Sequence, residues 1–118
     1  MGYDMYLIKA DKIKLNNTEN EIYYKDIERA TIDDVNSYYP VLNNFYQEHD
    51  ELRWAYEEYN MVSEKTLTEI IEWLKNKIDT ENFGLDNSEE TMTKMVYARI
   101  KNWIPLKENE IIYFEEDS

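Results

Sequence analysis

The sequence predicts a single α+β domain over residues 1–118, with a small antiparallel sheet packed against three to four helices and helices in the majority. Three observations lead to this prediction. An amphipathic helical pattern runs from Ser63 to Ile78, and a second follows Asn87. β-favouring runs lie at the two ends of the chain, at residues 3–9 and 111–114. We therefore expect the terminal strands to pair and the helices to cover them.

The segment from Ser63 to Ile78 carries the clearest pattern. Ser63 stands at the N-cap position, where its hydroxyl can accept an otherwise unpaired backbone N–H. Val62 and Leu67 are spaced as the two members of a hydrophobic staple. The apolar residues of the segment recur at steps of three and four and form one stripe of a helix: Leu67, Ile70, Ile71, Leu74 and Ile78.

The N-terminal third predicts short elements. Residues 3–9 predict a strand, 12–15 and 21–25 further short strands, and 26–30 one helical turn. Thr31 resembles a helix cap with acids in the following turn, which predicts a short helix from residue 33 to 39.

The next segment predicts a further helix. Pro40 either interrupts the preceding helix or opens a new one as its first residue. From there the apolar residues and one histidine recur at helical steps: Leu42, Phe45, His49, Leu52, Tyr56 and Tyr59. The pattern leaves open whether one helix runs unbroken from Pro40 to Tyr59.

The C-terminal third predicts a helix and then a strand. Asn87 can cap the helix, and Glu90 completes a capping box. Pro105 ends the pattern, and residues 111–114 form the closing strand. The predicted buried stripe of this helix is Met92, Met95, Val96, Ile100 and Trp103.

Composition limits the classes of function. The net charge is −13, from 26 acids and 13 bases, and no basic patch is present. Direct binding to nucleic acid or to a membrane is disfavoured, because both require clustered Lys and Arg, and a basic partner is favoured instead. Simple solubility is the alternative explanation of the acidity. The absence of cysteine, of a long apolar run and of a signal peptide predicts a cytoplasmic protein.

The opening residues resemble a known family. Met1 to Leu7 read Met-Gly-Tyr-Asp-Met-Tyr-Leu, which is similar to the Met-Gly-Leu-Asp-Met-Tyr-Leu that begins a family of small bacteriophage and prophage proteins. Met61-Val62-Ser63, which precedes a helix, and the aromatic C-terminal strand resemble the same family. The resemblance implies a mobile-element origin. It implies no activity, because the family is uncharacterised.

Residues 79–90 resemble a calcium loop in part. Four residues stand at ligand positions 1, 3, 9 and 12 of an EF-hand: Asp79, Glu81, Asn87 and Glu90. Gly84 occupies the invariant glycine position, but Phe83 stands where a ligand is needed. An ordinary helix–loop–helix connection is the favoured interpretation, so we predict no cofactor and retain a calcium-binding module as a minor alternative.

No pattern predicts an enzyme. His49 is the only histidine and lies on an apolar stripe, which favours a packed, hydrogen-bonded side chain over a general base. Paired acids such as Asp33-Asp34 are typical of solvated faces. No phosphate-binding loop, nucleophile elbow or zinc-ligand spacing is present.

The remaining feature is the acidic, tyrosine-rich surface. Rows of carboxylates can replace nucleic acid in a basic groove, and aromatic residues beside them can act as hot spots. We therefore predict an acidic, DNA-mimic or anti-CRISPR-like inhibitor of a host nuclease, CRISPR effector or other defence protein. The alternative is a structural or assembly protein of the mobile element, a homo-oligomer formed through the Met92–Trp103 face. The candidate partner-binding residues are Tyr38, Tyr39, Asp50, Glu51, Trp54, Glu57, Glu58, Tyr59, Glu89 and Glu90.

Overall fold

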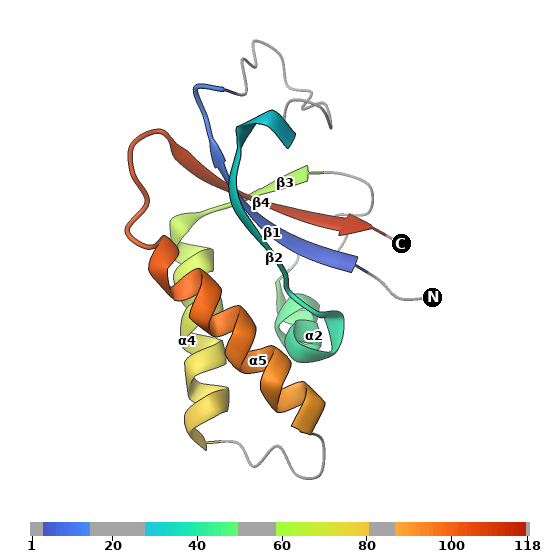
Figure 1. Cartoon of the computed structure of the whole chain (residues 1–118). Helices are drawn as coiled ribbons and strands as arrows, with labels where there is room; N and C mark the ends of the chain where they lie inside the picture. Colours follow the sequence, from blue (N-terminus) through green and yellow to red (C-terminus); the bar gives the residue numbers. More distant parts are fainter. Residues whose placement is uncertain (1–3, 15–27, 50–58, 81–86, 118) are drawn as a thin grey trace.

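A four-stranded antiparallel sheet and the helices α2, α4 and α5 make up most of the described part of the chain (Figure 1). The computed structural model describes residues 4–14, 28–49, 59–80 and 87–117. The sheet has the order β2-β1-β4-β3, so β1 and β4 are its middle strands. This arrangement confirms the predicted α+β class. The elements are β1 (Asp4–Asp11), β2 (Thr31–Asn36), α2 (Tyr39–Glu48), β3 (Tyr59–Val62), α4 (Glu64–Thr80), α5 (Asn87–Ile100), the 3-10 turn η1 (Lys101–Trp103) and β4 (Glu110–Asp117).

The two terminal strands pair along their whole length, as predicted. Asp4 lies opposite Asp117 at one end of the ladder, and Asp11 lies opposite Glu110 at the other. The runs at residues 3–9 and 111–114 are therefore neighbouring strands at the centre of the sheet. Each strand is longer toward the C-terminal side of the chain than its apolar run suggested.

The two faces of the sheet carry separate hydrophobic clusters, because successive side chains of a strand point to opposite faces. Leu7 and Phe114 belong to the main core, which the three helices cover. Ile8 and Tyr113 belong to a smaller cluster on the opposite face, together with Ala30. Burial raises the pKa of the Tyr113 phenol.

Helix α4 confirms the clearest prediction. The Ser63 hydroxyl accepts the Thr66 backbone N–H at 3.1 Å, as an N-cap residue should. Leu67, Ile70 and Leu74 are fully buried in the main core. Complete burial of side chains of this size contributes about 1.5–3 kcal/mol each, so this stripe is a major part of the stability of the helix.

Residues 31–36 form strand β2, and the predicted helix from residue 33 to 39 is wrong. Val35 pairs with Leu7 of β1, and Asp33 pairs with Lys9. The Asp33 carboxylate accepts hydrogen bonds from distant Arg99 and not from the first turn of a helix. The pattern of a capping threonine and two acids thus belongs to an edge strand, where its β-branched residues fit a pleated surface.

The other short N-terminal elements fare differently. Residues 12–14 form a turn after β1, so the predicted strand at 12–15 is wrong over its described part. Ile13, which this strand would have half-buried, is exposed. Residues 28–30 are helical, in line with the predicted turn at 26–30. The predicted strand at 21–25 lies outside the described residues.

Helix α2 is shorter than the helical spacing suggests. Pro40 lies in its first turn, which is one of the two predicted roles. The helix ends at Glu48, and His49 is extended, with φ −120° and ψ 96°. Tyr59 begins strand β3. The question that the pattern left open is therefore answered, because no single helix runs from Pro40 to Tyr59. Leu52 and Tyr56 lie outside the described residues.

Helix α5 begins at Asn87. The sequence predicted this residue as the cap that precedes the helix, whereas it is the first helical residue. Met95 is 54% exposed, so its predicted burial is wrong, and Thr93 is fully buried. The Thr93 hydroxyl donates to the Glu89 carbonyl at 2.8 Å, which satisfies its polar group in the interior. Val96, Ile100 and Trp103 of this stripe belong to the chain's own core, whereas Met92 is partly buried.

Candidate partner-binding site

The structure describes part of the predicted partner-binding set. Tyr38, Glu89 and Glu90 are described in full. Tyr39 is the first residue of α2 and Tyr59 is the first residue of β3. The structure describes the backbone of these two residues but not their side chains. The remaining predicted residues lie outside the described residues: Asp50, Glu51, Trp54, Glu57 and Glu58.

Tyr38 is part of the fold as well as of the surface. It precedes α2 with a positive φ of 53°, and the Asn36 side-chain oxygen accepts its N–H at 2.9 Å. Its ring is half-buried and packs against the main core. A positive φ costs a non-glycine residue free energy, and these contacts offset that cost. Tyr38 therefore closes the edge of the core.

Glu89 and Glu90 lie in the first turn of α5, where the helix dipole favours negative charge. The Glu90 carboxylate also forms an ion pair with Lys94 at 2.9 Å. Within the described segments no three His, Cys, Asp or Glu side chains gather as metal ligands. Asp79 lies in the last turn of α4 and Glu81 lies outside the described residues, so the calcium loop stays a prediction.

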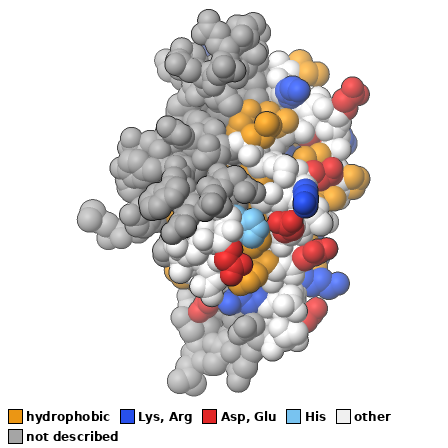
Figure 2. All heavy atoms as spheres, turned by 180° about the vertical axis from the view of Figure 1, so that it is seen from behind, with side chains coloured by type: hydrophobic (Ala, Val, Ile, Leu, Met, Phe, Trp, Pro, Cys, Tyr) orange, Lys and Arg blue, Asp and Glu red, His pale blue; other side chains and the backbone are white. Residues whose placement is uncertain are grey.

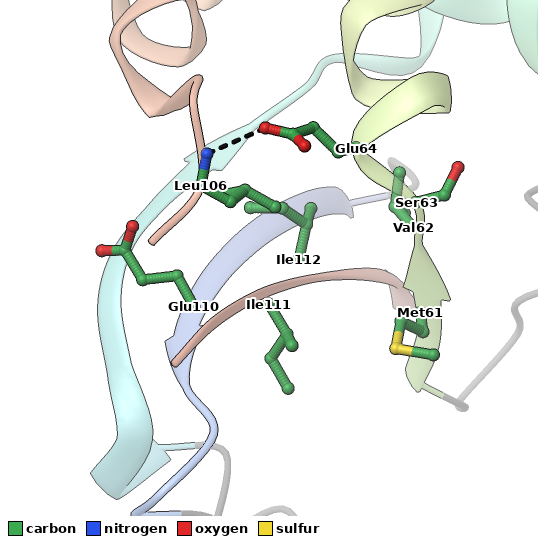
Figure 3. Close-up of a pocket in the computed structure, with 8 residues that line it drawn as sticks. All are labelled: Met61, Val62, Ser63, Glu64, Leu106, Glu110, Ile111 and Ile112. Atoms are coloured by element: carbon green, nitrogen blue, oxygen red, sulfur yellow. Dashed lines mark hydrogen bonds between the residues drawn. The ribbon is translucent and has the colours of Figure 1, made fainter. Parts of the chain in front are cut away.

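A groove that no sequence motif marks lies where β3 leaves the sheet (Figure 3). Strand β3 pairs with β4 only as far as Val62, opposite Ile112, and the chain then turns into α4. Strand β4 extends to Ile111 and Glu110, which pair with β1 on their other side. The space that a longer β3 would fill is a groove of about 250 Å³. It is lined by Met61, Val62, Ser63, Glu64, Leu106, Glu110, Ile111 and Ile112.

The first turn of α4 supplies a carboxylate to this groove. Glu64 is exposed, and its Oε1 accepts the Leu106 backbone N–H at 2.9 Å. Figure 3 shows this bond spanning the groove between α4 and the segment that precedes β4. Among the described residues, no donor forms a hydrogen bond or ion pair with the Oε2 atom. Met61, on the neighbouring strand end, has 66% of its surface exposed.

Glu110 is the second acid of the groove, and it is held by an ion pair. Its Oε2 lies 3.2 Å from the Lys9 Nζ, and their side chains are 6% and 14% exposed. The Lys107 backbone N–H donates to Oε1 at 2.8 Å. Burial raises the pKa of Glu110, but the Lys107 N–H and the Lys9 ammonium outweigh this effect, so the pKa lies below its ordinary value. Glu110 is thus ionised and already paired.

His49 is packed and hydrogen-bonded, as the sequence predicted. Its ring stacks on Phe45 with a centroid distance of 3.7 Å. The Nδ1 atom lies 2.9 Å from the Phe45 carbonyl, and Nε2 lies 3.2 Å from the Glu69 carboxylate. The sequence pattern did not predict the contact between His49 and Glu69, because the two residues lie twenty positions apart, one at the end of α2 and the other on α4. It ties α2 to α4.

The charges on the described surface are mixed. In Figure 2, acidic and basic side chains are interspersed over the described part of the face. The described part of this face therefore carries no continuous acidic row. The predicted acidic segment, residues 50–58, contains four acids and one arginine. It lies outside the described residues.

Comparisons with known proteins give no relative. No family model matches the chain, and no curated protein or solved structure matches it significantly. The resemblance to phage proteins accordingly stays a prediction. None of the described helices combines the length and the apolar character needed to span a membrane.

Proposed function

We propose that this chain is a phage- or prophage-encoded, non-enzymatic binding protein that inhibits a basic, nucleic-acid-binding host protein, such as a nuclease or CRISPR effector. The observation that carries the proposal is the net charge of −13 on 118 residues. A surface that binds nucleic acid is basic, so a strongly acidic protein is attracted to it over long range. The proposed mechanism is competition with nucleic acid.

The magnitude of the charge supports competition. Duplex DNA carries one charge per about 1.7 Å of its axis, and its binding sites are built to neutralise such a row. The acids of residues 50–58 supply four charges within nine positions of the sequence. On the described surface, α4 adds the exposed carboxylates Glu64 and Glu72.

The proposed origin rests on the residues that resemble phage proteins, from Met1 to Leu7 and from Met61 to Ser63.

An affinity capture with two matched baits tests the proposal. The first bait is the wild-type chain, and the second carries Asp50→Asn, Glu51→Gln, Glu57→Gln and Glu58→Gln. We expect the wild-type chain to retain a nucleic-acid-binding protein from host lysate at low salt and to release it at high salt or on addition of duplex DNA. The amide variant should retain much less.

Two results would contradict the proposal. One is recovery of the bait alone at low salt. The other is a large oligomer of the purified chain that light scattering finds unchanged by salt, because assembly through apolar contacts is insensitive to ionic strength.

A further inference from the structure

We infer that the groove at the end of β3 receives one long cationic side chain, an arginine or a lysine, of the basic partner. The inference rests on the proposed function for the chemistry of that partner. It adds the place on this chain where a single side chain docks.

The walls of the groove fit the aliphatic part of such a side chain. Val62 and Ile112 are buried and Leu106 is partly buried on the face of the sheet that the helices cover, and the partly buried Ile111 lines the groove from the other face (Figure 3). Met61 adds an exposed apolar surface at the rim. Lysine and arginine place their methylene groups against apolar surface while the charged end reaches a polar partner. The groove volume of about 250 Å³ has room for one side chain but not for a folded element.

Glu64 supplies the complementary charge. Its Oε1 accepts the Leu106 N–H, which fixes the carboxylate at the groove, and no donor among the described residues contacts Oε2. A carboxylate held in place by one hydrogen bond loses less conformational freedom when a cation binds its second oxygen. The position of this charge beside an apolar groove matches the two parts of a cationic side chain.

Glu110 has a different role in the groove. Lys9 and the Lys107 N–H already occupy its two oxygens, so it supplies a fixed wall and not the free acceptor. This difference makes the inference specific, because Glu64 and not Glu110 should determine the preference for a positive charge.

An NMR titration of the full chain with small probes tests the groove directly. The probes are the N-acetyl methylamides of arginine, lysine and citrulline, the last being a neutral analogue of arginine with nearly the same shape. We expect the arginine or the lysine probe to shift the amide signals of Met61, Glu64 and Ile111 saturably. The citrulline probe should bind about two- to five-fold more weakly than the arginine probe, which is the range expected for a solvent-accessible ion pair.

Two matched variants separate the groove from general attraction. Glu64→Gln removes the charge but keeps an amide oxygen that can accept the Leu106 N–H, so the fold is retained. Glu72→Gln removes the same charge from an exposed position of α4 that does not line the groove. We expect about two- to five-fold weaker binding of the cationic probes to Glu64→Gln and unchanged binding to Glu72→Gln.

Three results would overturn the inference: equal binding of citrulline and arginine, equal weakening by the two variants, or shifts that spread over the acidic surface without saturation. They would leave the proposed function standing, since capture of a basic protein at low salt does not require this groove. Conversely, saturable probe binding with no protein captured would refute the proposed function and retain the groove as a cation-binding site.

Discussion

Lys9 and Glu110 form an ion pair across the two central strands of the sheet, with 3.2 Å between Nζ and Oε2. They are diagonal neighbours, since Lys9 lies opposite Ile112 and Glu110 opposite Asp11. Both side chains are largely shielded from water, so the loss of either leaves the other poorly compensated. The pair also holds one wall of the groove.

Replacement of Lys9 should therefore destabilise the protein. We expect Lys9→Met to lower the free energy of unfolding by about 1–3 kcal/mol, because it leaves the Glu110 carboxylate without its cation. The double variant Lys9→Met/Glu110→Gln should recover part of this loss, since the amide can still accept the Lys107 N–H. Urea unfolding measures both. A double variant no more stable than Lys9→Met would contradict this account.

The same carboxylate predicts a dependence on pH. The pKa of Glu110 in the folded chain lies below its ordinary value of 4.5. Above pH 4.5 its contribution to stability is present in full. As the pH falls from there through the folded-state pKa, the unfolded chain binds the proton first, so this contribution is lost.

Urea unfolding of the wild-type chain and of Glu110→Gln should show this window. We expect the wild-type chain to lose more stability than the variant between about pH 5 and about pH 3, where carboxylates titrate. If the free energies of unfolding of the two proteins fell in parallel as the pH was lowered, other acids would account for the whole effect.

Asp33 should be important to the attachment of α5 to the sheet. Its Oδ1 accepts from the Arg99 Nε at 3.0 Å, and its Oδ2 accepts from the Trp103 indole N–H at 3.0 Å. We expect Asp33→Ala to lower the free energy of unfolding by about 1–3 kcal/mol, because it leaves the donor of a buried tryptophan unpaired. Asp34→Ala is the matched control, since Asp34 is exposed on the same strand and should stay within about 0.5 kcal/mol of the wild type.

The His49–Glu69 contact should contribute a small coupling energy. The Glu69 side chain is 41% exposed, so solvent screens the pair. A double-mutant cycle with His49→Gln and Glu69→Gln should give about 0.2–1 kcal/mol. Any capture of the basic partner should survive both substitutions. Loss of capture without loss of stability would instead assign His49 to binding.

The sequence was sufficient to predict the helices and strands whose pattern lies within one short segment. Ser63 caps α4, and the spacing of Leu67, Ile70 and Leu74 identifies the buried face, because cap and stripe belong to the same short segment. The terminal strands were found for a similar reason. Their pairing followed from the need of two apolar runs to share one sheet.

Elements that depend on distant partners were missed. Thr31 and Asp33 fit a helix start as well as an edge strand, and the residues that decide between them, Arg99 and Trp103, lie more than sixty positions away. Met95 has the hydrophobicity of a core residue, but the orientation of α5 buries Thr93 in its place. Local patterns do not contain this information.

The candidate site could be predicted still less. The groove combines residues 61–64 with residues 106–112, which meet only because β3 pairs with β4 and then stops. The predicted acidic row rests mainly on residues 50–58, so the structure neither supports nor contradicts it. Only Glu89 and Glu90 of that row, in the first turn of α5, could be placed.

The central position of β1 and β4 has a consequence for biosynthesis. Asp4 and Asp117 lie more than one hundred positions apart in the sequence, yet they form one end of the central ladder. While the ribosome still holds the C-terminal strand, the inner edge of β1 has no β4 to pair with. The sheet therefore closes only after β4 has left the exit tunnel, and until then the nascent chain presents an open strand edge of the kind that chaperones protect.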